Sequence, residues 1–235
     1  MQIAFLETSA EGLDDEERML VASTLEEAHV DVARALPDFP SPFVVTVRVD
    51  RRVNAQTGEM GRLVTRNWLD WAIDPWRPDQ PARGVIAARL RASFVHEAHH
   101  ATRAALLVDA KPNARQPENP VERALLVPTR SRRLVQIAVE EGLAVAFERD
   151  LCPDAMTLGA RDLTGVPIDA WTRELIAAGD GDYFEWFFEH RDGRRGVGYQ
   201  VALHLVGEAI RRSGRSAAAL VGSPVDDVIE LALAR

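Results

Sequence analysis

Hydrophobic residues in the N-terminal third of the chain recur with two different periods. The short apolar run Ile3–Leu6 predicts a strand. From Asp14 to Leu36 the apolar residues recur every three or four positions, which predicts a helix. The first turn of this helix is acidic, as the helix dipole favours, and Pro37 and Pro40 follow its end.

The next segment has the composition of a β-sheet. Phe43–Val49 is rich in β-branched residues and predicts a strand, and Arg62–Ile73 predicts one further strand or two. Three tryptophans fall between positions 68 and 76. They either pack in the core beside the sheet or line a cleft, and packing is the commoner case because tryptophan is usually largely buried.

The middle of the chain predicts two long helices. Val85–Val108 contains no proline or glycine and is rich in alanine, leucine and arginine. Arg132–Arg149 follows Ser131, a plausible N-cap. The polar, proline-rich stretch Lys111–Pro120 between them predicts a surface loop.

The C-terminal part predicts more helices. One runs from about Asp169 to Ala178, one opens at Gly196–Tyr199 and continues to about Ser213, and the last begins near Pro224. The aromatic run Tyr183–Phe188 predicts core packing. We therefore expect an α+β protein, mainly helical with a small N-terminal sheet. We expect one domain over 1–235, with a helix-and-sheet part (1–82), a central helical part (83–150) and a C-terminal helical part (151–235).

The charge, the cysteine count and the hydrophobic runs argue against several classes of protein. The 235 residues are 46% hydrophobic and carry a net charge of −8, which argues against a general nucleic-acid surface. One cysteine, Cys152, allows neither an internal disulfide nor a cysteine-rich zinc site. No stretch has the length of a membrane span, and the N-terminus lacks the features of a signal peptide. We expect a cytoplasmic protein that binds neither membrane nor nucleic acid.

The first long central helix carries the motif His96-Glu97-Ala98-His99-His100. Residues four apart lie on one face of a helix, so His96 and His100 can bind one zinc ion. Glu97 between them can then act as general base on a zinc-bound water. His99 lies about 100° around the helix from His100, which favours a packed, supporting or exposed role over that of a third ligand.

The second long central helix carries two adjacent glutamates, Glu140 and Glu141, in an apolar surrounding. A glutamate on an apolar helix face costs free energy unless it is paired or binds a metal. The flanking residues modestly favour Glu141 as the inward-facing one, while both being solvated stays open. Gly142 beside Glu141 would let the two long central helices approach closely.

Together, the His-Glu-x-His-His and Glu-Gly-Leu-Ala segments resemble the gluzincin metallopeptidases. They look most like the uncharacterised bacterial zinc-dependent protease family known as the YjaZ-like group. The likeness runs over roughly Val85–Leu205 and includes a Gly-Tyr pair, Gly198-Tyr199, at the start of a late helix. The resemblance implies a zincin-like fold, in which a small sheet with an edge strand along the cleft packs on the motif helix.

The resemblance also implies the roles of particular residues. It makes His96, His100 and Glu141 the ligands of a Zn2+ cofactor and Glu97 the general base. Many gluzincins carry a supporting carboxylate four residues after the ligand glutamate, where this chain has Val145. That support must then come from another group, for which the candidates are Glu148, Asp109 or a backbone carbonyl.

The expected activity is hydrolysis of peptide bonds in a peptide or protein substrate. The oxyanion that forms on the attacked carbonyl needs a donor besides the zinc, and we choose Tyr199. A purely packing role for Tyr199 is an equal alternative, and His190 and His204 are other candidate donors. Two further functions stay open: an inactive, zinc-stabilised binding protein, and an interaction or stress protein in which the motif is fortuitous.

Overall fold

The computed structural model describes residues 1–6, 12–79, 81–109, 133–155 and 165–234. The predicted loop Lys111–Pro120 and the predicted N-cap Ser131 lie outside these ranges. The chain divides into two compact units. The first unit comprises Met1–Val127 and Asp150–Met156, and the second comprises Pro128–Arg149 and Thr157–Arg235.

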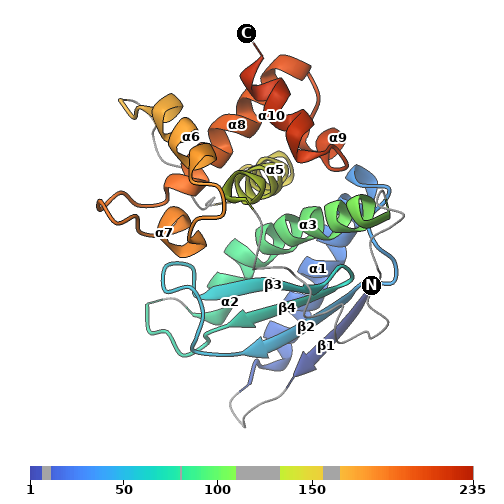
Figure 1. Cartoon of the computed structure of the whole chain (residues 1–235). Coiled ribbons are helices and arrows are strands. Elements are labelled where there is room, and N and C mark those ends of the chain that lie inside the picture. The colour runs from blue at the N-terminus through green and yellow to red at the C-terminus, as the bar shows by residue number, and fades with distance from the viewer. Residues whose placement is uncertain (7–11, 80, 110–132, 156–164, 235) are drawn as a thin grey trace, which may run out of the picture. The chain divides into compact units, whose positions relative to one another are not determined.

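The first unit contains a four-stranded sheet (Figure 1). Its strands are β1 (Gln2–Leu6), β2 (Val44–Val49), β3 (Glu59–Thr65) and β4 (Trp68–Ile73), in the order β1-β2-β4-β3. β1, β2 and β4 are parallel, and β3 pairs antiparallel with β4 at the edge of the sheet. The predicted segment 62–73 is therefore two strands, with a register shift in β3 between Leu63 and Thr65.

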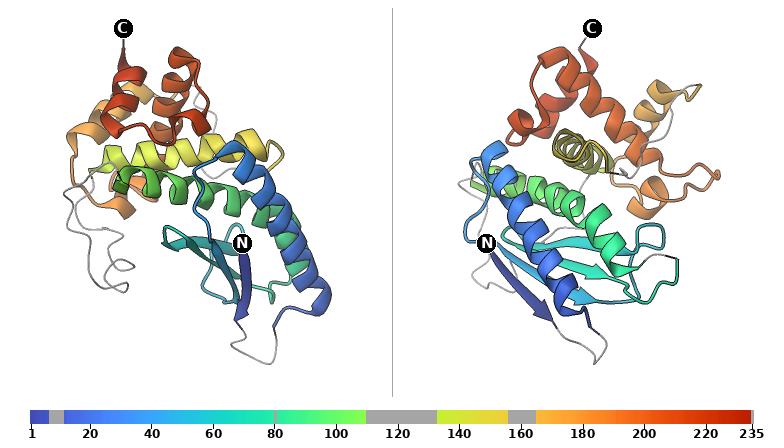
Figure 2. Two further views of the ribbon diagram at one scale, coloured as in Figure 1. Left: turned by 90° about the vertical axis from the view of Figure 1, so that its right-hand side faces the viewer. Right: turned by 180° about the vertical axis from the view of Figure 1, so that it is seen from behind.

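Helices cover one face of this sheet (Figure 2). α1 (Asp15–Ala35) begins with a capping box, in which Asp14 accepts from the Glu17 backbone and Glu17 from the Asp14 backbone. The motif helix begins as α2 (Ala82–Val85) and continues through the π-helical turn η1 (Ile86–Leu90) into α3 (Arg91–Asp109). α3 packs against α1 and β3.

The core of the first unit follows the predicted hydrophobic periods. On α1 the buried residues are Val21, Leu25, Ala28 and Val32, which are spaced by three or four. Phe39, Phe43 and Phe94 form an aromatic triad with ring centroids 4.7–6.2 Å apart. Because Phe94 lies two residues before His96, this triad fixes the start of the motif segment against the core.

The second unit is helical. Its helices are α5 (Leu134–Leu151, whose last two residues belong to the first unit), α6 (Ile168–Ala177), α7 (Tyr183–Phe187), α8 (Val197–Ser213), α9 (Ala217–Leu220) and α10 (Val225–Leu233). α6, α7 and α10 each contact α8. α5 approaches α8 where it has no side chain, because a Cβ atom on Gly142 would lie 2.5 Å from the Ala202 carbonyl oxygen. Gly142 thus permits a close approach of α8, whereas the approach of the motif helix to Gly142 stays a prediction.

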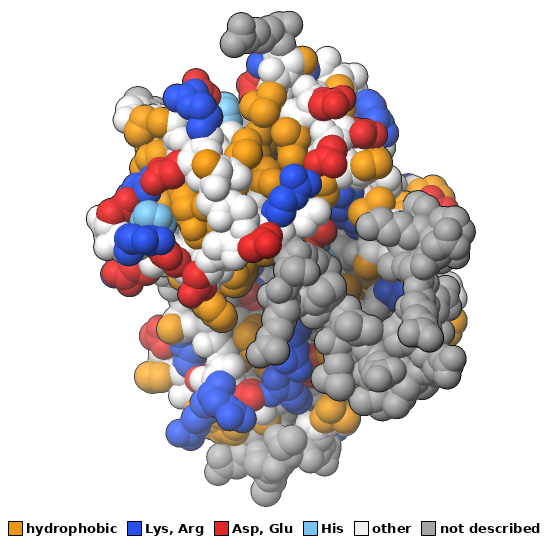
Figure 3. Space-filling view, viewed as in Figure 1, with side chains coloured by type: hydrophobic (Ala, Val, Ile, Leu, Met, Phe, Trp, Pro, Cys, Tyr) orange, Lys and Arg blue, Asp and Glu red, His pale blue; other side chains and the backbone are white. Residues whose placement is uncertain are grey.

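The aromatic run Tyr183–Phe188, which forms α7 and its C-cap, is only partly in the core. Trp186 and Phe187 are buried, whereas the side chains of Phe184 and Phe188 are 70% and 51% exposed. A five-residue helix cannot bury all its faces against one neighbour, so the prediction that the whole run packs in the core was wrong for these two residues. Hydrophobic side chains also gather at the surface over α8 and α10 (Figure 3).

The predicted α+β class, mainly helical with a small N-terminal sheet, is confirmed. The single-domain organisation over 1–235 stays a prediction. The predicted central part, 83–150, contributes to both compact units, since α3 belongs to the first and α5 to the second up to Arg149. None of the helices in the described ranges is long and apolar enough to cross a membrane.

Candidate metal centre

His96 and His100 lie one turn apart on α3, in the first unit. The helix buries Val95, Ala98 and Ala101, whereas the two imidazoles are only half-buried. The apolar residues therefore orient α3 so that one stripe is fixed in the core. The adjoining stripe, which carries both imidazoles, is half-buried.

The two imidazoles face each other through the same atom. Their Nε2 atoms lie 3.1 Å apart, and their ring planes meet at 68°. Two nitrogen ligands about 2.05 Å from one zinc ion at a tetrahedral angle are separated by about 3.3 Å. The observed spacing therefore fits two ligands of one zinc ion. It also fits a hydrogen bond in which one neutral ring donates to the other.

Glu97 points to the edge strand of the sheet. The backbone N–H of Leu63 on β3 donates to its Oε2 at 3.1 Å. Gly61 lies under the same side chain, because a Cβ atom at Gly61 would lie 3.5 Å from Glu97 Cγ. The carboxylate predicted to be the general base is thus held by the main chain of β3.

A buried polar network joins α3 to β3 one turn before Glu97. Ser93 Oγ donates to Glu59 Oε2 at 2.7 Å, and Trp71 Nε1 donates to the same oxygen at 2.9 Å. Arg89 Nε lies 3.6 Å from Glu59 Oε1, and both side chains are 5% exposed. A buried carboxylate is stable only when its charge is compensated in this way.

His99 is completely buried. Of the three roles left open for it, the exposed one is therefore wrong. One turn further along α3, Arg103 is also buried, with 2% of its surface exposed. The face of α3 that bears these two residues is polar and buried, and it is distinct from the half-buried stripe of His96 and His100.

The glutamate pair lies on α5, in the second unit. Glu140 and Glu141 are both half-buried, so burial does not distinguish them, and the choice of Glu141 stays a prediction. Glu148, a candidate for supporting a zinc ligand, is 4% exposed, and its supporting role stays a prediction. The side chain of the other candidate, Asp109, lies outside the described part of the chain.

Tyr199 lies in the first turn of α8, also in the second unit. Its ring meets that of Phe187 edge-to-face, with centroids 5.2 Å apart, and packs against the hydrophobic core of this unit. Gly198 beside it leaves room for Phe187, since a Cβ atom there would lie 2.7 Å from that ring. The ring of Tyr199 thus has a packing function, while a role of its hydroxyl group stays a prediction.

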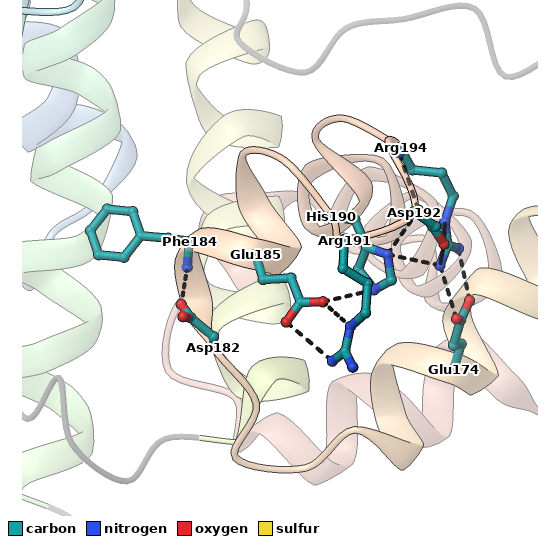
Figure 4. Close-up of polar contacts among 8 residues, drawn as sticks. All are labelled: Glu174, Asp182, Phe184, Glu185, His190, Arg191, Asp192 and Arg194. Atoms are coloured by element: carbon teal, nitrogen blue, oxygen red, sulfur yellow. Dashed lines mark hydrogen bonds and ion pairs between the residues drawn. The ribbon is translucent and has the colours of Figure 1, made fainter.

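His190, an alternative donor, lies in a cluster of ion pairs in the second unit (Figure 4). The imidazole is 7% exposed, with Nδ1 2.8 Å from Asp192 Oδ1 and Nε2 3.6 Å from Glu185 Oε1. The other alternative, His204, lies 3.4 Å from Asp169 in a hollow between α6, α8 and α10. Both histidines therefore face carboxylates of their own unit.

The carboxylates around His190 also have metal-binding chemistry. Ligand atoms of Glu174, His190 and Asp192 all lie within 4.8 Å of one another. However, Arg194 already bridges the two acids, with its guanidinium nitrogens 2.7–2.9 Å from Glu174 and 2.7 Å from Asp192. Hydrogen bonds from its guanidinium group lower the pKa of both carboxyl groups. A salt-bridge cluster that links α6 to the loop before α8 explains this group without a metal ion.

Comparison with known proteins adds no relative: no protein-family model, curated protein or solved structure matches the chain. The gluzincin resemblance therefore stays a prediction that rests on the motif residues.

The neighbours of Glu97 on β3 were not identified from the sequence. Gly61 interrupts an otherwise ordinary strand, and a glycine inside a strand often marks the close approach of another group. The glycine at position 61 could therefore have indicated this close approach. The donor itself, the Leu63 N–H, is a backbone group and leaves no trace in the residue type.

Proposed function

We propose that this protein is a zinc-dependent hydrolase, and specifically a metallopeptidase with Glu97 as the general base. The observation that carries the proposal is the 3.1 Å separation of His96 Nε2 and His100 Nε2, close to the spacing of two tetrahedral zinc ligands. The presence of Glu97 supports an enzyme over a purely structural zinc site, because metal binding alone does not require a base.

In this proposal, each residue has a defined task. His96, His100 and Glu141 hold the ion, with Glu141 assigned from the resemblance and from its place on an apolar helix. A bound zinc ion would supply a Lewis acid that polarises the substrate carbonyl and lowers the pKa of a water molecule to about 7. Glu97 would accept the proton of the attacking water and pass it to the leaving amine.

The proposal also covers the fold, the oxyanion donor, the substrate and the location of the protein. The sheet on α3 with β3 at its edge supports a zincin-like arrangement of the first unit. Tyr199 is the proposed donor to the oxyanion, and the substrate is a peptide or protein. A cytoplasmic location stays a prediction from the sequence.

The test separates zinc binding from turnover. We would dialyse the full-length protein extensively, measure its zinc content by mass spectrometry, and incubate it with a library of unstructured peptides. The variants are Glu97→Gln, which keeps the shape of the side chain but cannot act as a base, and His96→Ala. We expect about one zinc per chain and peptide cleavage in the wild type, zinc without cleavage in Glu97→Gln, and neither in His96→Ala.

Other results would contradict the proposal in distinct ways. Zinc in the wild type without cleavage would favour a zinc-stabilised binding protein. A wild type without zinc would mean that the motif is fortuitous. Cleavage retained in Glu97→Gln would exclude Glu97 as the base.

A further inference from the structure

Two contacts join the edge strand β3 to the motif helix, and they are four residues apart in each element. Ser93 on α3 bonds the side chain of Glu59 on β3, and Glu97 accepts from the backbone of Leu63. Both partners advance by four residues, from Ser93 to Glu97 and from Glu59 to Leu63. The strand and the helix are therefore joined at two points, which lie about one turn apart on α3 and four residues apart on β3.

The place of β3 in the sheet allows the second of these contacts, from the Leu63 N–H to Glu97. β3 lies at the edge of the sheet, and its register with β4 shifts between Leu63 and Thr65. Backbone N–H groups of an edge strand that do not face the neighbouring strand are open to other acceptors. The Leu63 N–H donates to the Glu97 side chain on α3.

Gly61 provides the space that the contact needs. A Cβ atom there would lie 3.5 Å from Glu97 Cγ and 3.6 Å from Ser93 Cβ, which is ordinary van der Waals contact. Alanine would therefore fit at this position. The two additional methyl groups of valine would have to displace Glu97 or Ser93.

We propose that β3 is a positioning element for the general base, with the Leu63 N–H fixing one oxygen of the Glu97 carboxylate. This inference rests on the proposed function and deepens it, since Leu63 acts only through Glu97. A hydrogen bond from a backbone N–H to a carboxylate is charge-assisted and stronger than a neutral one. It restricts the rotation of the glutamate side chain and holds the carboxylate in one orientation.

The contact can be tested without any enzyme assay. In full-length ¹⁵N-labelled protein, we would measure hydrogen exchange at the Leu63 amide in the wild type, Glu97→Ala and Glu97→Gln. Glu97→Ala removes the acceptor and should accelerate exchange by about 10- to 100-fold, the range for a lost hydrogen bond to a charged group. Glu97→Gln keeps a carbonyl oxygen and should retain most of the protection. Equal exchange in all three proteins would overturn the proposal.

A second comparison tests the effect on turnover. Leu63→Pro and Leu63→Ala both lose the leucine side chain, but only the proline variant loses the N–H. We expect kcat of Leu63→Pro to be about 10- to 100-fold below that of Leu63→Ala, with similar KM and zinc content. If the proline variant does not fold, Gly61→Val is compared with Gly61→Ala. In this pair the Leu63 N–H is kept, and only valine is large enough to displace Glu97.

These outcomes separate the inference from the proposed function. Faster exchange in Glu97→Ala, in a protein that cleaves no peptide, would retain the contact and refute the hydrolase. Equal kcat in the paired variants of an active enzyme would retain the hydrolase and refute the positioning role of β3.

Discussion

Gly142 on α5 lies so close to Ala202 on α8 that a Cβ atom on the glycine would be 2.5 Å from the alanine carbonyl oxygen. The obstructing atom belongs to the backbone, so it cannot be displaced by a change of rotamer. Gly142→Ala should therefore force α5 and α8 apart and lower the free energy of unfolding by about 1–3 kcal/mol. Thermal unfolding followed by circular dichroism would measure this as a decrease in Tm, by about 2–4 °C per kcal/mol.

Gly207 on α8 provides the matched control, because a Cβ atom there would have nothing within 4 Å. Gly207→Ala should raise the free energy of unfolding by about 0.5–1 kcal/mol, since alanine loses less backbone entropy than glycine in a helix. If the two variants were equally stable, the close packing of α5 against α8 would be contradicted.

The zinc-ligand prediction concerns the choice between Glu140 and Glu141. We expect His96→Ala, His100→Ala and Glu141→Ala each to lower zinc occupancy sharply, because three protein ligands are the usual minimum at a catalytic zinc site. Glu140→Ala is the control and should keep the ion. Zinc content after dialysis against a weak chelator measures the effect.

The opposite pattern has a definite meaning. Full occupancy in Glu141→Ala together with its loss in Glu140→Ala would show that the adjacent glutamate is the ligand. If neither substitution changed occupancy, the gluzincin arrangement would be wrong.

Glu208 on α8 predicts a pH dependence of stability. It accepts hydrogen bonds from Arg211 and Arg212, which lower its pKa from 4.5 to about 2. Because the pKa is lower in the folded state, the stabilisation is fully present above about pH 4.5 and is lost as the pH falls towards 2. Surface pairs of this spacing contribute about 0.2–0.5 kcal/mol each.

Urea unfolding of the wild type and Glu208→Gln at pH 7, 4.5 and 3 would test this. The wild type should be more stable by about 0.4–1 kcal/mol at pH 7, and the difference should shrink at pH 3. High salt at pH 7 should also reduce it. A difference that is the same at all three pH values would mean that the pairs of Glu208 do not contribute through its charge.

A long and regular hydrophobic period predicts the bounds of a helix well. The helix Asp14–Leu36 appears as α1 over Asp15–Ala35, because four apolar positions at helical spacing select a single buried face. The same reasoning could not detect the π-helical turn at Ile86–Leu90, since one additional residue per turn changes the backbone without changing the residue types.

The candidate site was predictable as far as its chemistry is contained in side chains. His96, Glu97 and His100 were identified because metal-binding residues at a spacing of four have a clear chemical meaning. The network of Glu59, Ser93 and Trp71 was not, because it joins positions 12 and 34 residues apart whose meeting depends on the sheet register. β3 and β4 form a hairpin that is local in the sequence, but the contact of Ser93 with Glu59 joins that hairpin to a helix 34 residues away, which no local pattern contains.

The last prediction concerns Tyr199, whose ring packs edge-to-face on Phe187. A phenol, with a pKa near 10, stays neutral at pH 7 and can donate a hydrogen bond to a developing oxyanion. Losing one such donor costs about 2.7–4 kcal/mol of transition-state stabilisation. Tyr199→Phe keeps the aromatic contact, so it should leave Tm and zinc content unchanged while lowering kcat by about 100- to 1000-fold, with little change in KM.

Tyr199→Ala is the comparison, because it also removes the packing and should lower Tm. If the phenylalanine variant cleaves peptides as fast as the wild type and only the alanine variant is impaired, Tyr199 acts through its ring alone. The donor must then be another group, of which His204 and His190 are the next to replace.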